Sequence, residues 1–470
     1  MILVSGILFA LMFHVSSAET LNAHELVQGS LRYLVSEQKQ ETEGDDHYQG
    51  EWPSFIYNDE PIYLLGEKGK TAYDSNCFTT ASIRNTLAAL YLKHSEYSEI
   101  LPMLRLSKDY VERYRDEGTD QYGFWQRYPS EKNPEIRVRR PNHYRLDSNF
   151  IREAANVPAD ADDTSVAFVG RFFDQKLGIG TDAPDDVGTV FAPHRDRHRW
   201  NIHYYNFIYG LHLKTGAFLT WLYHEKVLNP LAPLPHKSKP NIPYGANEVD
   251  CVVNANVLTA LAYGHALDTP GVTRACRFIN RAIRRKEFDR CGVYYPNRYH
   301  LHYAVAKAIE AGASCLNESE DGLIRDLIST QNADGGWSST KPHDLFQKLG
   351  DGLNLILIKS IEKDRLSTRS LKNLEGIDPR DRVQATLYAT NALLRLRRNQ
   401  ETTKAIDRGI RFLSQNALFE NGTIHWKGGV FFSGGTLIRS AMRWRSDSYS
   451  TAIGAETFQM FIDQSGGTQP

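Results

Sequence analysis

A two-part unit recurs along the chain, and this repetition constrains the fold more than any other feature. The first part is an amphipathic helix that ends in Gln, followed by a Gly-containing turn and an aromatic residue. The clearest copy spans 322–337 and contains Gln331, Gly335 and Trp337. Further copies, some of them degenerate, lie at 31–52, 122–125, 278–295 and 410–426. Such units bury their apolar faces against one another, so the repetition predicts a stack of helical pairs.

The second part of the unit is a helix that begins at polar residues and is apolar on more of its circumference. Six such starts occur, near Asp74, Asp162, Asp250, Arg298, Asp381 and Asp447. A helix with one apolar stripe belongs on the outside of a pair, and a helix that is apolar on several faces belongs inside. Six pairs of this kind close into an α/α toroid. In this all-α fold, the N-terminal ends of the inner helices surround one mouth of a central cavity.

Two stretches depart from the repeat. The outer helix of the third pair is not recognisable, because 180–199 is acidic, then basic, and contains Pro and Gly. This composition is typical of a loop and predicts a long insertion at about 176–245. The segment 343–363 predicts an extra helix. We therefore expect residues 19–470 to form a single toroid domain of about six helical hairpins, and a two-domain division at the insertion is the alternative.

The N-terminus has the character of a targeting segment. Residues 2–15 are almost wholly apolar, and the small residues Ser16, Ser17 and Ala18 follow. This pattern predicts a signal peptide at 1–18 and a secreted or periplasmic protein. An uncleaved N-terminal anchor is the alternative, although the apolar run is short for a transmembrane helix.

The cysteine content limits which classes of protein the chain can belong to. The chain has 5 cysteines, an odd number, and none of them form a Cys-x-x-Cys pair. We therefore expect no disulfide framework, although export is compatible with one bridge. The Cys and His spacing does not suit a zinc site.

The net charge of the chain is close to zero, because Lys and Arg number 55 against 56 Asp and Glu, a net charge of −1. This balance does not favour nucleic acid as a partner, nor an anionic membrane surface.

The densest group of acids lies at 158–168. Asp160, Asp162 and Asp163 fall within four residues and precede Thr164, at the start of an apolar helical stretch. One Asp or Thr is enough to cap a helix. Crowded carboxyl groups cannot all ionise cheaply, so one of them is expected to keep a proton and serve as a general acid. The alternative is a capped helix with a spare solvated acid.

The repeats and the acidic motif resemble the terpenoid cyclase and protein prenyltransferase superfamily of α/α toroids. The segment 331–337 is similar to its QW repeat, Q-x3-G-x-W. The segment 160–164 is similar to the DxDDT motif of class II terpene cyclases, including squalene–hopene cyclases. This resemblance implies that Asp162 donates a proton to a terminal alkene, and that Asp160 and Asp163 orient it. The protein prenyltransferases are less similar, because their zinc site uses Asp-x-Cys and His.

A run of cations supplies one further candidate site. Arg195 and Arg197 lie among several His and Arg residues between 193 and 200. Guanidinium groups match planar anions, so these two arginines are candidates for binding a diphosphate, sulfate or uronate group. The alternative is a solvated loop.

His300, His302 and Asn254, polar residues at the inner helices, complete the predicted substrate-binding set together with Thr164. His300 and His302 open the fourth inner helix and would face the cavity mouth, or would cap and pack there. Asn254 and Asn256 lie in an otherwise apolar helix, where they either bond neighbouring helices or line a wet cavity. Thr164 is included because it completes the acidic motif.

These observations predict an exported protein similar to terpenoid cyclases, and a protonation-initiated class II isoprenoid cyclase if it is an enzyme. That reaction starts without a metal, and we expect no cofactor. An exported glycan-active toroid, either a lyase or a hydrolase, is one alternative. A non-catalytic toroid that binds a partner is another. The expected ligand is a small molecule or a glycan in the central cavity, and membrane contact is expected only for an isoprenoid substrate.

Overall fold

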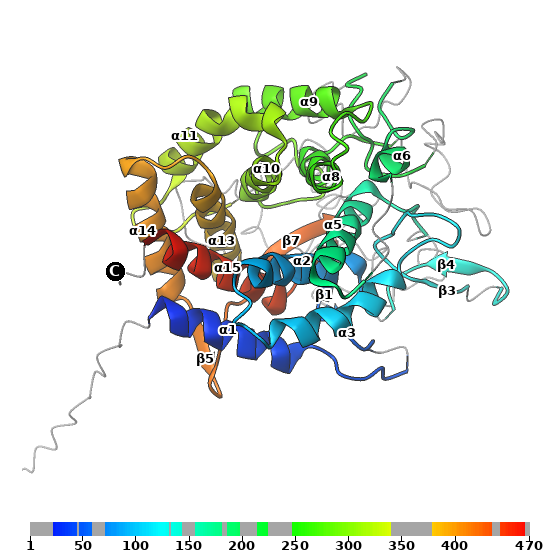
Figure 1. Cartoon of the computed structure of the whole chain (residues 1–470), viewed down its shortest axis with the longest axis horizontal. Coiled ribbons are helices and arrows are strands. Elements are labelled where there is room, and N and C mark those ends of the chain that lie inside the picture. Colours follow the sequence, from blue (N-terminus) through cyan, green and yellow to red (C-terminus); the bar gives the residue numbers. More distant parts are fainter. Residues whose placement is uncertain are drawn as a thin grey trace, which may run out of the picture.

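The computed structural model describes residues 22–44, 47–58, 71–130, 133–142, 156–180, 186–197, 214–223, 247–339, 378–434 and 442–465. Within these ranges the chain is mostly helical, with short strands (Figure 1). No helix in them combines the length and the apolar character needed to cross a lipid bilayer. The expected signal peptide at 1–18 and the expected helix at 343–363 lie outside the described residues.

A closed ring of helices forms the inner layer of the described structure. Each helix of the ring contacts the next in sequence order, and the last contacts the first. Each begins close to a polar start that the sequence indicated. The members are α2 (Cys77–Lys93), α5 (Ala161–Leu177), α8 (Cys251–Tyr263), α10 (Tyr299–Ala311), α13 (Pro379–Arg395) and α15 (Asp447–Ser465).

Amphipathic helices surround this ring (Figure 1). They are α1 (Ala23–Glu37), α3 (Ile100–Glu112), α9 (Val272–Arg284), α11 (Glu320–Thr330) and α14 (Gln400–Gln415). The outer helix that the sequence did not reveal for the third pair is α6 (Val187–Phe191), which has only five residues and packs on α8. A 3-10 helix, η3 (Ser314–Ser319), contacts α9 and α10.

The tryptophan of the repeated turn holds an outer helix in place. In three turns, the indole N–H of the tryptophan donates to a backbone carbonyl near the end of the preceding outer helix, at 2.8–2.9 Å. The pairs are Trp52 with Leu34, Trp337 with Leu327, and Trp426 with Leu413. All three tryptophans are at most 1% exposed. At each of these three turns, a buried indole group and its hydrogen bond therefore hold the outer helix in place.

Glycine is required in two of these turns. Gly50 and Gly335 have φ values of +91° and +88°, which L-residues with a side chain rarely adopt. A Cβ atom would lie 2.1 Å from the carbonyl oxygen of Leu106 in α3, or 2.5 Å from that of Arg408 in α14. The turn therefore needs glycine both for its backbone conformation and for the close approach of the next outer helix.

A second hydrogen bond joins five turns to the inner ring. The backbone N–H of the aromatic turn residue donates to a polar side chain of an inner helix, at 2.9–3.3 Å. We call this the turn-to-helix bond. The pairs are Trp52 with Thr80, Tyr122 with Thr164, Phe218 with Asn254, Trp337 with Thr386, and Trp426 with Thr451.

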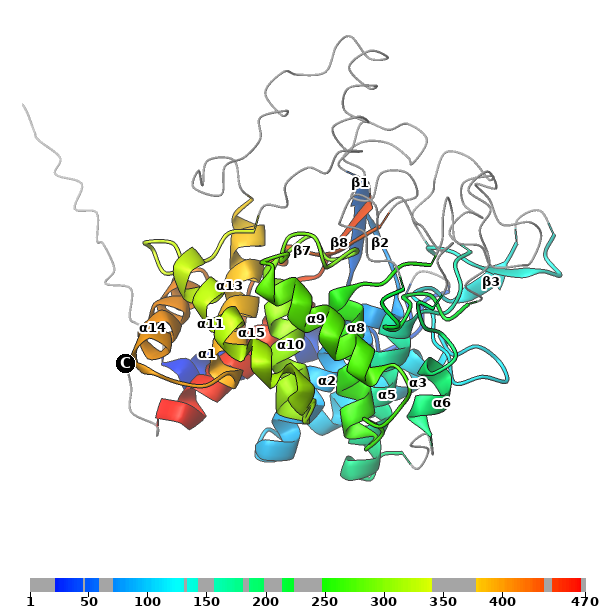
Figure 2. The same ribbon diagram turned by 90° about the horizontal axis from the view of Figure 1, so that it is seen from above.

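The strands depart from the all-α prediction. Four of them pair antiparallel in the order β2 (Thr71–Tyr73), β1 (Phe55–Asn58), β8 (Met442–Arg445) and β7 (Val430–Gly434). Because β2 directly precedes α2 and β8 directly precedes α15, this sheet lies beside the helix starts at one end of the ring (Figure 2). The hairpins β3 (Arg127–Pro129)–β4 (Arg137–Arg139) and β5 (Leu418–Glu420)–β6 (Thr423–His425) are separate. These strands are too short for their period-2 pattern to be recognised in the sequence.

The disulfide expectation was wrong. Cys251 is bonded to Cys291 and Cys276 to Cys315, with Cα–Cα separations of 5.3 and 5.9 Å, and Cys77 is a buried free thiol. An odd number of cysteines is therefore compatible with two bridges and one thiol. The pairing joins residues 40 and 39 positions apart, so the sequence contains no short spacing that would reveal it.

Candidate active site

Asp160 caps the helix that carries the acidic motif. It has an extended backbone, and its Oδ1 accepts the backbone N–H groups of Asp162 and Asp163 at 3.0 and 2.8 Å. Burial raises the pKa of Asp160 to about 6, although hydrogen bonds from Asp163 oppose this shift. The first acid alone therefore supplies the N-terminal cap of α5.

Asp162 is held by side chains from other segments. The amide of Asn256 in α8 donates to its Oδ1 at 2.6 Å, and the hydroxyl of Tyr295 donates to its Oδ2. The residue is 6% exposed. Burial raises the pKa of Asp162 well above its ordinary value, and the charges of Asp160 and Asp250 add to this effect, whereas the Asn256 hydrogen bond opposes it. Asp162 is therefore a buried carboxyl group whose raised pKa favours its protonated form.

Asp163 is buried close to Asp160 and to Cys77, the first residue of α2. Burial, followed by the charge of Asp160, raises the pKa of Asp163 well above its ordinary value. Two neighbouring buried carboxyl groups cannot both ionise cheaply, so we expect at least one of this pair to stay protonated.

Tyr295 belongs to a cluster of aromatic side chains that the inner helices contribute. The Tyr295 ring centroid lies 4.3 Å from that of His300 and 6.1 Å from that of Phe78. His300 lies 4.5 Å from Tyr388, whose hydroxyl donates to Tyr449 at 3.2 Å. Tyr295 therefore joins Asp162 to an aromatic cluster contributed by α2, α10, α13 and α15.

Thr164 and Asn254, two of the predicted substrate-binding residues, make the turn-to-helix bond. Thr164 is 0% exposed and accepts the N–H of Tyr122 at 2.9 Å. Asn254 is also 0% exposed, and its amide bonds both the N–H and the carbonyl of Phe218, at 3.0 and 2.9 Å. Both side chains thus have structural partners in the fold. Their role in substrate binding stays a prediction.

The two histidines of α10 face different layers. His300 lies in the aromatic cluster described above. His302 stacks on Phe288 with a centroid distance of 4.6 Å, and its Nε2 lies 3.0 Å from a carboxylate oxygen of Asp326 in the outer helix α11. The structure therefore brings only His300 near Asp162 through Tyr295, and places His302 between the two layers.

The arginine candidates lie in the outer part of the molecule. The Arg195 guanidinium donates to the carbonyl of Ala192 at 2.8 Å, and its Cδ packs beside Gly271, which caps α9. Burial, followed by the charge of Arg197, lowers the pKa of Arg195. Arg197 is exposed. Their predicted role in binding an anionic group stays a prediction.

Three residues at the site were not among the sequence candidates. Asn256 had stood out only as a polar residue in an apolar helix, and the spacing gave no reason to prefer it to Asn254. Tyr295 and Cys77 reach the acids from distant parts of the chain, across 133 positions in the case of Tyr295. Nothing local in the sequence marks such a contact.

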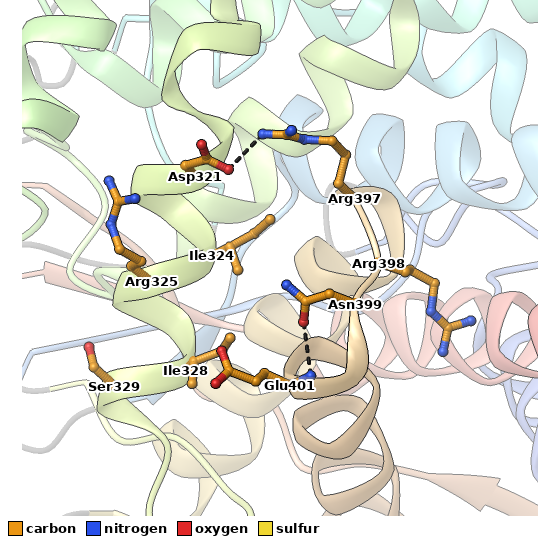
Figure 3. A pocket seen from close by; sticks show the side chains of 9 residues that line it. All are labelled: Asp321, Ile324, Arg325, Ile328, Ser329, Arg397, Arg398, Asn399 and Glu401. Atoms are coloured by element: carbon orange, nitrogen blue, oxygen red, sulfur yellow. Dashed lines mark hydrogen bonds and ion pairs between the residues drawn. The ribbon is translucent and has the colours of Figure 1, made fainter.

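A groove on the outer surface is separate from this site. It has a volume of about 440 Å³ and lies between α11 and the start of α14 (Figure 3). Ile324 and Ile328 line it together with charged side chains, and Arg397 pairs with Asp321 across one end. None of its lining residues belongs to the candidate site.

Across the described part of the chain, no group of three or more His, Cys, Asp or Glu side chains is arranged to hold a metal ion.

Neither the protein-family models nor the curated proteins include a match to this chain. Solved structures do resemble it. One is a variant of the type II terpene cyclase MstE from Scytonema in complex with geranylgeranyl dihydroxybenzoate, its substrate, with a TM-score of 0.54 and 12% identity over 93% of this chain and 97% of that chain. Another MstE variant, bound to its product merosterolic acid A, has a TM-score of 0.53 and 12% identity over 94% and 98%. A protein from Actinoplanes has a TM-score of 0.52 and 11% identity over 93% and 99%. At these identities the likeness is one of fold, and the chain has a fold similar to that of terpene cyclases.

Proposed function

We propose that this protein is a protonation-initiated cyclase of isoprenoids, built on an α/α toroid, in which Asp162 is the general acid. One observation carries the proposal. Asp162 does not cap α5, and its carboxyl group is instead buried against Asn256 and Tyr295. A helix start that needed only a cap would not require this arrangement.

Burial gives Asp162 the property that an acid catalyst needs. The raised pKa keeps the carboxyl group protonated where an ordinary Asp would be ionised. The proton passes from the carboxyl oxygen to the less substituted carbon of a terminal trisubstituted alkene, and the other alkene carbon becomes a tertiary carbocation. Asn256 and Tyr295 then donate hydrogen bonds to the carboxylate that remains. These bonds favour the ionised form and promote proton release.

The aromatic cluster suits the cation that follows. Tyr295 contacts Asp162, and its ring centroid lies 6.1 Å from that of Phe78. Tyr388 and Tyr449, 6.4 Å apart, belong to the same cluster, and aromatic faces stabilise a positive charge through cation–π contact. Attack by the next double bond closes a ring, and loss of a proton or capture of water ends the reaction. A glycan-active site would instead place two carboxyl groups across a cleft. Here Asp160 caps α5, and Asp162 and Asp163 lie in its first turn, so all three acids belong to one helix start.

The substrate class and the location of the protein belong to the same proposal. A linear isoprenoid with a terminal trisubstituted alkene is the simplest molecule that Asp162 could protonate. The likeness of the fold to MstE, whose substrate carries a geranylgeranyl chain, supports this choice. The two disulfides support export, because such bonds persist in oxidising compartments. The signal peptide at 1–18 and the single domain at 19–470 are proposed on the sequence pattern.

Turnover in D₂O tests the reaction. The purified protein is incubated with linear isoprenoids of increasing length, with and without a metal chelator, and the products are analysed by mass spectrometry. We expect cyclic products that gain one deuterium from the acid and that form equally well with the chelator. Asp162→Asn keeps the shape of the side chain but has no acidic proton, so it should form none. Deuterium-free products, or an active Asp162→Asn protein, would refute the assignment of the acid.

A further inference from the structure

Both hydrogen-bond partners of Asp162 lie on segments that one disulfide joins. Asn256 is in α8, which begins at Cys251, and Tyr295 lies four residues after Cys291. The Cys251–Cys291 bond therefore connects the two segments that reach Asp162 from outside α5. Both cysteines are buried, at 0% and 2% exposure.

Asp250 and the backbone reinforce this connection. The N–H of Cys251 donates to the carbonyl of Cys291 at 2.9 Å. Asp250 caps α8 with its Oδ1 and accepts the N–H groups of Val293 and Tyr294 with its Oδ2. The chain immediately before Tyr295 is thus anchored to the start of α8 by a covalent bond, a backbone hydrogen bond and a carboxylate.

We propose that the Cys251–Cys291 disulfide, together with Asp250, positions the Tyr295 hydroxyl on Asp162 and so sets the strength of the proposed acid. The inference deepens the proposed function and rests on it. Productive acid catalysis needs its hydrogen-bonding groups held within about 0.5 Å of their working positions. A loop residue such as Tyr295 meets that demand only when its backbone is fixed, and the bridge supplies the fixation. Cys251, Cys291 and Asp250 are positioning residues, because they act through Tyr295.

The second disulfide is a matched control. Cys276 in α9 is bonded to Cys315 in η3, and both elements belong to the outer layer. The two bridges close loops of nearly equal length, with separations of 40 and 39 residues. Their removal should therefore cost comparable stability through the unfolded chain. Only the removal of Cys251–Cys291 should alter the site.

The first measurement does not depend on turnover. The carboxyl C=O stretch of Asp162 is isolated as the infrared difference between a protein and its Asp162→Asn derivative, and it is followed as a function of pH. The comparison covers the wild type, Cys251→Ser/Cys291→Ser, Cys276→Ser/Cys315→Ser and Tyr295→Phe. The ionisable groups near Asp162 are the same in all of these proteins except for Tyr295 itself: Asp160, Asp163, Asp250, His300, Tyr295 and Tyr449.

A bond from Tyr295 favours the ionised carboxylate, so its loss should move the titration of Asp162 to higher pH. We expect this shift in Cys251→Ser/Cys291→Ser and in Tyr295→Phe, with no further shift when the two changes are combined. The Cys276→Ser/Cys315→Ser protein should titrate like the wild type. An unmoved titration in folded Cys251→Ser/Cys291→Ser, or an equal shift in the control, would overturn the proposal. If the serine variant does not fold, Cys251→Ala/Cys291→Val makes the same test with better apolar packing.

Turnover provides the second measurement. In Cys251→Ser/Cys291→Ser, kcat should fall by roughly tenfold, which is the effect of losing one hydrogen bond to a charged group. KM should change little, and Tyr295→Phe should abolish the difference between bridged and unbridged proteins. A wild-type protein without cyclase activity would refute the proposed function, and the infrared titration would still decide whether the bridge positions Tyr295.

Discussion

The starts of α5 and α8 are built on the same plan but carry different side chains. Asp160 and Asp250 each cap their helix by accepting two N–H groups. Four residues later, Thr164 and Asn254 make the turn-to-helix bond. Between cap and bond, α5 has Asp162 and Asp163 where α8 has Val252 and Val253.

The difference shows which acids the fold needs. Valines occupy the second and third positions of α8, where Val252 and Val253 are both 1% exposed. Two carboxyl groups in the corresponding positions of α5 are therefore not required for the helix start. Burying them is costly, because each must stay protonated or find hydrogen-bond donors. A costly feature that a neighbouring repeat lacks is most simply explained by chemistry at α5.

The strongest test copies the α8 side chain into α5. Asp162→Val should lower turnover by about 10²–10⁴-fold, the usual contribution of a general acid. The free energy of unfolding should change little, because removal of a buried carboxyl group is favourable whereas Asn256 and Tyr295 lose their acceptor. Steady-state kinetics and urea denaturation measure the two effects. A variant that loses stability and keeps its turnover would mean that the two helix starts do not differ in function.

The reverse exchange should damage the fold. Val252→Asp places a carboxyl group in α8 without the partners that Asp162 has, and we expect a loss of about 3–5 kcal/mol in the free energy of unfolding. Chemical denaturation at neutral pH measures this loss, and part of it should be recovered at low pH, where the new carboxyl group is protonated. A well-tolerated Val252→Asp would show that this layer of the ring accepts acids in general.

The turn-to-helix bond, which both helix starts share, predicts a smaller change in stability. Thr164→Val leaves the N–H of Tyr122 without its side-chain acceptor and should cost about 1–2 kcal/mol of stability, as buried donors do. Thr80→Val, at the corresponding position of α2, is the control and should cost about as much. Both proteins should keep their kcat. A selective loss of affinity for substrate in Thr164→Val would instead support the substrate-binding role predicted from the sequence.

At the start of α2, a buried acid predicts that the stability of the protein depends on pH. Asp74 accepts the indole N–H groups of Trp125 and Trp444, and burial raises its pKa from 3.8 to about 7. The folded state therefore binds the Asp74 proton more tightly than the unfolded chain does. This stabilisation is complete below about pH 4 and is lost as the pH rises through 7. Asp74→Asn should reduce the fall in Tm between pH 4 and pH 7, and an unchanged slope would contradict the assignment.

Sequence reasoning reached the helical pairs because their signals are local. The caps, the Gln–Gly–Trp turns and the apolar periodicity each lie within one unit, so the mostly helical character was predicted. The sheet was missed because its strands come from both ends of the chain. Phe55, for example, lies opposite both Tyr73 and Arg445.

The candidate site was predictable only in part. Asp160, Asp162 and Asp163 were found because they are adjacent in the sequence. Their partners come from other helices, and no local pattern distinguishes Asn256, which contacts Asp162, from Asn254, which contacts Phe218. The role of Asp160 as the cap also needed the observed backbone geometry.

The contact between α1 and α15 has a consequence for biosynthesis. These helices lie at opposite ends of the described chain, yet they pack on each other, and α15 also closes the inner ring against α2. During translation, the apolar side chains of α1 and α2 are fully covered only after α15 has left the ribosome. Every described element before α15 is therefore synthesised before ring closure, a condition that favours slow folding and assistance from chaperones.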